Sequence, residues 1–157
     1  MKLLEEKVIL MWGLITEESI IKIKKENKTV ILPEHRPYLL GLKYNLSRLK
    51  QHGILCVYCN DNSLGFLFYK GMIEKTYLLY IDKQAEGLQC FSGSLYVVLM
   101  SKLHNIPLEA IKGGRIENTF LDKDAATLEG RSLLIEEQPV RYVVQPDNEF
   151  ISWEELK

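Results

Sequence analysis

Several polar side chains in this sequence come directly after short apolar runs, where a parallel sheet would place them at one edge. Arg36 and Lys83 carry the positive charge that attracts an anion, and the carboxylate of Asp82 accepts hydrogen bonds from hydroxyl groups. Residues 92–94 open a helical pattern, and such a helix start can hold a phosphate through backbone N–H groups; close packing on a sheet explains the glycine equally well. The candidate ligand-binding residues are Glu34, Arg36, Asp61, Asp82, Lys83, Ser92, Gly93 and Ser94.

Each of these side chains also has a purely structural explanation. Asp61 stands beside the start of an expected helix, and a role as its cap is the better explanation for this residue alone. Glu34 and Arg36 can form an ion pair that holds a loop, and Asp82 with Lys83 can form a solvated turn. The binding hypothesis therefore rests on the whole cluster of residues and not on any one member.

The cysteines and histidines show no spacing typical of a metal site. Cys56 and Cys59 are three residues apart, and residues at that spacing in one strand point to opposite faces. No second pair supplies the other two ligands of a structural zinc site. We therefore predict unpaired thiols, no metal and no cofactor, and the odd number of cysteines fits a reducing cytoplasm.

Apolar runs alternate with segments of helical period between residues 7 and 112. Five buried strands separated by four helices predict an α/β fold, a Rossmann-like doubly wound parallel sheet. Ligands of such sheets bind beyond the carboxyl ends of the strands, where the candidate residues fall. The expected strands are 7–12, 28–32, 54–58, 76–81 and 106–111, and the expected helices are 16–25, 39–53, 60–71 and 92–104.

Two of the expected helices carry specific signals. Thr16 has the residue type of an N-cap, and acidic residues follow it while lysines close the helix, as the helix dipole favours. The second helix has apolar residues three and four positions apart, which predicts one buried stripe. The stripe consists of Leu39, Leu42, Leu46 and Leu49.

The composition fits a single domain, residues 1–157, with a core at 7–112 and a C-terminal arm at 115–157 that adds strands or packs on the main layer. In this arm, Phe150 and Trp153 are either interface anchors or pack back onto the same chain. A net charge of -1 gives no broad attraction to DNA or to an anionic membrane. No apolar run approaches the roughly 20 residues of a membrane span, so we expect neither partner.

Five blocks of the sequence, taken in order, resemble the translation initiation factor 2B subunit (alpha/beta/delta)-like family, which is related to methylthioribose-1-phosphate and ribose-1,5-bisphosphate isomerases. The resemblance covers only the C-terminal Rossmann-like domain of that family, and the chain begins almost at its first strand. It implies that fold and a homodimer, because family members pair through this domain. The blocks are EHRPYLLG (34–41), GILCVYCNDNSLGFLF (53–68), YIDKQAEG (80–87), SGSLYVVLMSKLHNIP (92–107) and LLIEEQP (133–139).

The departures from this family concern its chemistry. In the isomerases, a cysteine after the first strand and an aspartate in the fourth-strand signature carry the reaction. Asp82 matches the aspartate, but the cysteine position falls near Gly13 and Lys83 replaces the signature arginine. Cys90 and Phe91 stand in place of a substrate-binding Asn-Lys pair. Since isomerisation needs acid/base partners and a firm phosphate anchor, the resemblance implies a non-catalytic site.

Three functions remain open on these grounds. The first is a binding or regulatory module that retains a pocket for a phosphorylated small molecule or nucleotide and works through protein association. The alternative is a sugar-phosphate aldose–ketose isomerase with an altered site, in which Asp82 is the acid/base and Cys59 or Cys90 is the second group; a buried structural thiol is the better explanation for each cysteine. The third is a purely structural domain with a degenerate site.

Overall fold

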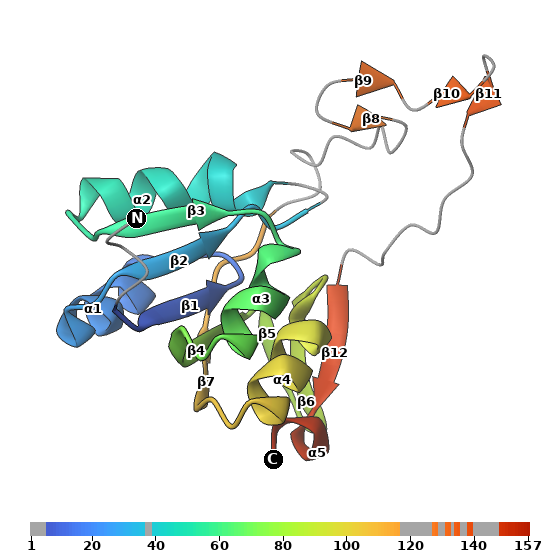
Figure 1. Cartoon of the computed structure of the whole chain (residues 1–157). Coiled ribbons are helices and arrows are strands. Elements are labelled where there is room, and N and C mark those ends of the chain that lie inside the picture. The colour runs from blue at the N-terminus through green and yellow to red at the C-terminus, as the bar shows by residue number, and fades with distance from the viewer. Residues whose placement is uncertain are drawn as a thin grey trace.

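The computed structural model (Figure 1) describes residues 6–36, 39–116 and 148–157, together with the backbone of four two-residue strands between 127 and 139. Those four strands are β8 (Thr127–Leu128), β9 (Arg131–Ser132), β10 (Leu134–Ile135) and β11 (Gln138–Pro139). The other strands are β1 (Val8–Trp12), β2 (Val30–Pro33), β3 (Cys56–Cys59), β4 (Ile73–Tyr80), β5 (Asp82–Gln84), β6 (Gly87–Phe91), β7 (Leu108–Lys112) and β12 (Asn148–Ser152). The helices are α1 (Glu17–Glu26), the π-helical η2 (Gly41–Asn45), α2 (Leu46–Gln51), α3 (Ser63–Tyr69), α4 (Ser94–Leu103) and α5 (Trp153–Leu156).

The main sheet is parallel and has the strand order β3-β2-β1-β4-β7. The chain first builds outward from β1 to β3, then returns to the other side of β1 for β4 and β7. Ile9 in β1 pairs with Val30 in β2, and Leu10 pairs with Thr76 in β4. This order confirms the predicted Rossmann-like doubly wound sheet, and the reversal of direction beside β1 is the point where such sheets hold ligands.

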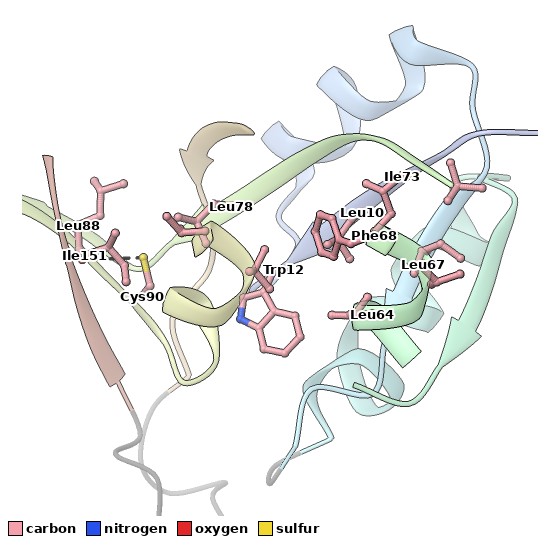
Figure 2. Close-up of a cluster of buried hydrophobic side chains, with 14 residues drawn as sticks. Leu10, Trp12, Leu64, Leu67, Phe68, Ile73, Leu78, Leu88, Cys90 and Ile151 are labelled. Atoms are coloured by element: carbon pink, nitrogen blue, oxygen red, sulfur yellow. Dashed lines mark hydrogen bonds between the residues drawn. The ribbon is translucent and has the colours of Figure 1, made fainter. Parts of the chain in front are cut away.

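Alternating side chains of the buried strands form two cores, one on each face of the sheet. Leu10 and Trp12 pack with α3, α4, β6 and β12, whereas Ile9 and Met11 pack with α1 and α2. Figure 2 shows Trp12 between two groups of the first core, one made of Leu64, Leu67 and Phe68, the other of Leu88, Cys90 and Ile151. Helices therefore cover both faces, as predicted.

Helix α1 begins at the predicted residue and forms a complete capping box. The side chain of Thr16 accepts a hydrogen bond from the backbone N–H of Ser19, and the hydroxyl of Ser19 accepts one from the backbone N–H of Thr16. The helix ends at Asn27, which adopts a left-handed conformation with φ of 49°. The N-cap prediction for Thr16 is confirmed.

The predicted stripe of the second helix is wrong at Leu42. A π-helical turn, η2, precedes α2 and adds a residue to the helical repeat, so Leu42 faces solvent while Asn45 turns inward. The buried amide of Asn45 accepts a hydrogen bond from Ile15 N (2.9 Å) and donates one to Gly13 O (2.8 Å). The π turn therefore places Asn45 where its side chain hydrogen-bonds the loop that follows β1.

A small antiparallel sheet, β12-β6-β5, packs beside the main one and was not predicted. Residues 148–152 pair with β6, and Ile151 is buried in the first core. Trp153 also packs back onto the chain, because its indole N–H donates to Ala85 O at 2.7 Å. The segment predicted at 141–144 lies outside the described residues. No helix in the described ranges is long and apolar enough to cross a membrane.

Candidate functional site

A pocket of about 550 Å³ opens at the carboxyl edge of the main sheet, where the direction of chain winding reverses. Its volume falls in the range of small-molecule sites. Three strand ends and the start of α4 contribute to its wall. The lining residues are Trp12, Glu34, Arg36, Asp61, Asn62, Gly93 and Tyr96.

Trp12 ends β1 and forms an aromatic part of the wall, although only 3% of its surface is exposed. The edge of its indole lies against Gly93, where an added Cβ would come within 2.3 Å of Cζ2 of Trp12. Gly93 also has a φ of +88°, which disfavours any side chain. The glycine at the start of α4 is therefore explained by close packing on Trp12, the alternative that the sequence left open.

His35 packs against the indole of Trp12. Its imidazole stacks on Trp12 with ring centroids 4.0 Å apart and meets the edge of Phe91 at 5.8 Å. Burial lowers the pKa of His35 to about 3, so the ring is neutral at physiological pH. Trp12 Nε1 and His35 Nε2 are both buried and have no hydrogen-bond partner among the described residues.

Asp61 holds the loop that carries His35 and Arg36. One carboxylate oxygen accepts the backbone N–H of His35 at 2.8 Å, and the other accepts that of Arg36 at 2.7 Å. Burial raises the pKa of Asp61, and these two hydrogen bonds oppose the shift. The helix-capping prediction for Asp61 is wrong, because the side chain of Asn60 is the one that accepts the backbone N–H of Ser63 at the start of α3.

Glu34 and Arg36 form the ion pair that the structural explanation expected, with 3.3 Å between Arg36 Nε and Glu34 Oε1. The hydroxyl of Tyr58 donates to the other oxygen of Glu34 at 3.4 Å. The pKa of Tyr58 is raised, first by desolvation and then by the neighbouring Glu34 carboxylate. The pocket wall therefore carries opposite charges that already contact one another.

The start of α4 is occupied by an anion that belongs to the chain itself. The carboxylate of Glu149, in β12, accepts the backbone N–H groups of Gly93 and Leu95, each at 2.8 Å. Ser92 and Ser94 beside them are buried, and the hydroxyl of Ser94 donates to Phe91 O at 2.6 Å. The backbone donors that the sequence assigned to a phosphate thus hold Glu149.

Asp82 and Lys83 lie on β5 and are not among the residues that line this pocket. Asp82 is half-exposed, and its Oδ2 lies 3.7 Å from a guanidinium nitrogen of Arg115. The ammonium of Lys83 lies 5.5 Å from the ring centroid of Trp153. The structure therefore brings together Glu34, Arg36, Asp61 and Gly93, and it places Asp82 and Lys83 on a neighbouring hairpin.

The three cysteines are free thiols, as predicted. Cys56 and Cys59 pack against opposite faces of the sheet. Desolvation raises the pKa of both Cys59 and Cys90 to about 12, so neither forms a thiolate near neutral pH. In the described ranges no group of three or more histidine, cysteine, aspartate or glutamate residues could hold a metal ion.

Comparison with known proteins gives two kinds of similarity, although no family model matches the chain. The methylthioribose-1-phosphate isomerase of Oleidesulfovibrio alaskensis is 30% identical over 117 residues, which are 73% of this chain and 31% of that protein. A putative methylthioribose-1-phosphate isomerase of Methanothermobacter thermautotrophicus is 36% identical over 80 residues, 50% of this chain and 25% of its own length. This chain is a homologue of the methylthioribose-1-phosphate isomerases. It spans between a quarter and a third of the length of these relatives.

Two crystal structures share the fold of this isomerase homologue. Translation initiation factor eIF-2B, subunit delta, from A. fulgidus has a TM-score of 0.75 and 17% identity, and the match covers 96% of this chain and 51% of that one. The 5-methylthioribose 1-phosphate isomerase from Pyrococcus horikoshii has a TM-score of 0.74 and 17% identity, with 96% and 48% covered. The resemblance proposed from the sequence blocks is therefore confirmed.

Gly13, near which the sequence resemblance placed the isomerase cysteine, has no room for a side chain in this homologue. Gly13 has a φ of +117°, and a Cβ there would lie 2.3 Å from the backbone oxygen of Leu79. The neighbouring Trp12 instead fills the end of β1 with an indole. The departure seen in the sequence is thus fixed by backbone packing.

Sequence reasoning missed four residues of this site. Trp12 ends a correctly predicted strand, so the rule that ligands bind at strand tips would have found it. Asn62 and Tyr96 stand near the starts of predicted helices but carry no spacing signal. No local pattern points from Glu149 to the start of α4, because the two lie more than 50 residues apart in sequence and meet through β12 pairing with β6.

Proposed function

We propose that this isomerase homologue is a binding or regulatory module whose pocket holds a small metabolite without isomerising it. The observation that carries the proposal is the pocket at the switch point of the sheet, which Trp12 helps to line; the buried indole N–H of Trp12 has no partner among the described residues. The names of the relatives indicate a sugar-type ligand. The free state of all three thiols fits action in the cytoplasm.

The contacts around the pocket disfavour the alternative, a sugar-phosphate isomerase. Asp82 would have to act as the acid/base, yet it does not line the pocket and lies near Arg115. Cys59 and Cys90 are poor partners, since a thiol with a pKa of about 12 scarcely ionises at neutral pH. A catalytic side chain at Gly13 itself is sterically excluded. Losing one member of a catalytic pair removes most of the rate.

The sequence suggested a phosphorylated metabolite or a nucleotide as the ligand, and such compounds form the first set to test. Arg36 is the cation in the wall of the pocket, and it is paired with Glu34. We propose that the sugar or ring portion of the ligand lies against Trp12 and Tyr96, since aromatic faces pack well on such groups.

The test combines calorimetric titration with a turnover assay on the same preparation of the full chain. We expect methylthioribose, its 1-phosphate or a nucleoside to bind, with no ketose product formed. Trp12→Ala should abolish binding, whereas Leu55→Ala, a matched change at an exposed residue away from the pocket wall, should not. Turnover that disappears in Asp82→Asn would establish the isomerase instead, and the absence of binding by every compound would favour a structural domain.

We also propose that the module works as a homodimer through the α3–α4 apolar face. This face comprises exposed side chains on two helices that contact one another: Phe66, Tyr69, Tyr96, Leu99 and Leu103. Leu103 and Tyr69 are 71% and 74% exposed, which is unusual for large apolar residues on one surface. A second copy of the chain would cover them. Phe150, 46% exposed, remains available as an additional anchor.

Sedimentation of the full chain over a range of concentrations tests this association. We expect a dimer that Leu103→Glu converts to a monomer, because a buried unpaired carboxylate is costly at an interface. Ile21→Glu is the matched control, since Ile21 on α1 is also a large apolar residue, 61% exposed, but lies on another helix. A monomer for the unaltered chain, or equal effects of both substitutions, would contradict the α3–α4 apolar face as the interface.

A further inference from the structure

We infer that the pocket selects an uncharged, hydroxyl-bearing ligand, such as a free sugar or a nucleoside, over the corresponding phosphate ester, with Glu149 as a specificity-determining residue. This inference rests on the binding function proposed above and narrows its ligand class. It goes against the expectation of a phosphorylated ligand. The contacts that carry it involve the charges in the wall and the start of α4.

The charges of the wall do not favour a further anion. Arg36 contacts Glu34 at 3.3 Å, so its charge is already balanced within the wall. Asp61 adds another carboxyl group, and both of its oxygens accept backbone N–H groups. A phosphate dianion would therefore enter a wall with two carboxyl groups and one cation, where like charges repel at short range. A hydroxyl group would instead donate to these carboxylate oxygens.

The position at which a helix would bind a phosphate is filled. Glu149 accepts the N–H groups of Gly93 and Leu95, and this carboxylate already interacts favourably with the positive end of α4. A phosphate could use these donors only by displacing the carboxylate of Glu149, whose backbone is held in place by the pairing of β12 with β6 along five residues. Gly93 lines the pocket, so Glu149 sets the charge at that part of the wall.

Two buried groups at this edge have no partner among the described residues: Trp12 lines the pocket, and His35 stacks on Trp12 without lining it. Trp12 and His35 are each 3% exposed, their rings are stacked, and their Nε1 and Nε2 atoms have no partner among the described residues. Buried polar groups are seldom left without hydrogen bonds. The indole N–H can only donate, whereas a neutral imidazole nitrogen donates or accepts according to its tautomer. An acceptor oxygen of a ligand would satisfy the indole N–H of Trp12 whether that oxygen belongs to a hydroxyl group or to a phosphate, so the charges of the wall and Glu149 carry the selectivity.

Two matched pairs of compounds test the inference by titration calorimetry on the full chain. They are methylthioribose with methylthioribose-1-phosphate, and adenosine with adenosine monophosphate. We expect the neutral member of at least one pair to bind about tenfold more tightly than its phosphate ester, a difference of about 1.4 kcal/mol. Its dissociation constant should change little between low and high salt, since no net charge is recognised.

Two substitutions locate the effect. Trp12→Phe keeps an aromatic ring but removes the N–H, and we expect it to weaken the neutral ligand roughly 3- to 10-fold. Glu149→Gln removes the charge at the start of α4, so the phosphate ester should gain affinity. The ratio between the dissociation constants of the phosphate ester and the neutral compound should then become smaller. Thermal melting of both variants shows whether they fold, and the salt dependence of the unaltered chain tests the inference even if they do not.

The outcomes separate this inference from the proposed function. Tighter binding of the phosphate ester by the unaltered chain, without turnover, would overturn the selectivity but leave the binding module intact. Turnover of methylthioribose-1-phosphate, or no binding of any of the four compounds, would overturn the proposed function and the inference with it. If Glu149→Gln folds and leaves the ratio of these dissociation constants unchanged, Glu149 does not determine the selectivity between the two compounds.

Discussion

Trp12 and His35 stack at the carboxyl edge of the sheet with their ring centroids 4.0 Å apart and an interplanar angle of 25°. The two residues come from the ends of adjacent strands, β1 and β2, and both are almost fully buried. His35 reaches this position with a φ of 61°, a conformation that is costly for most residues. The stack therefore joins an unusual backbone geometry to a buried titratable group beside the pocket.

Protonation of His35 should make folding stability fall in mild acid. In the unfolded chain the imidazole binds a proton below about pH 6.5, but in the folded chain burial holds its pKa at about 3. Between these values the unfolded state binds more protons, so stability is lost as the pH falls, by about 1.4 kcal/mol per pH unit. Urea unfolding at pH 7 and pH 5 measures the loss, for which we expect roughly 2 kcal/mol.

His35→Asn is the matched control for this effect, since asparagine tolerates a positive φ and does not titrate. The pH dependence of the free energy of unfolding, compared between the unaltered chain and His35→Asn, gives the part due to His35. Asp61 is present in both chains, and its raised pKa changes stability with pH in the opposite direction. Equal slopes of stability against pH for both chains would show that His35 is accessible to protons in the folded state.

Replacing Asp61 by asparagine should loosen the loop at residues 34–36. The amide offers one acceptor where the carboxylate accepts two backbone N–H groups, so one buried donor loses its partner. We expect a loss of about 1–3 kcal/mol in the free energy of unfolding and faster amide exchange at Arg36. Asn62→Ala is the control, because this exposed neighbour makes no capping bond to α3 and should change stability by less than about 0.5 kcal/mol.

A methyl group at Gly93 should be poorly tolerated. It would lie 2.3 Å from Trp12 and sit on a backbone with a φ of +88°, so overpacking and backbone strain add together. We expect Gly93→Ala to cost about 2–4 kcal/mol by urea unfolding. Gly71→Ala separates backbone strain from overpacking, since Gly71 has a φ of +65° and a Cβ there would meet nothing within 4 Å. This substitution should cost only about 1 kcal/mol. Equal costs would exclude Trp12 as the cause.

The buried amide of Asn45 should be needed for the loop after β1. Asn45→Ala leaves the backbone N–H of Ile15 and the carbonyl of Gly13 without their buried partner, so we expect a loss of about 1–3 kcal/mol. Ser47→Ala, on the exposed side of the same helix, should change stability by less than about 0.5 kcal/mol. Denaturant unfolding of the pair gives the comparison, and matching values would contradict the role of Asn45.

The order of strands and helices was readable from the sequence because its signals are local. Apolar runs such as residues 7–12 mark strands that are buried on both faces, and Thr16 caps its helix through a residue three positions away. The edge at which Glu34, Arg36 and Asp61 gather followed from the parallel topology alone. Leu42 was misplaced because a π turn shifts the helical period without a composition signal.

The sequence by itself determined the fold class, the kinship with the isomerases and the edge of the sheet where a pocket forms. Only the tertiary structure decided what that pocket contains: the stack of Trp12 on His35, the two backbone bonds to Asp61, and Glu149 rather than a ligand at the start of α4. The physical reason is the distance along the sequence over which each kind of interaction acts. Periodicity and capping act within a few residues, whereas a buried donor takes whichever acceptor the packed chain brings to it, and that partner can lie 56 residues away.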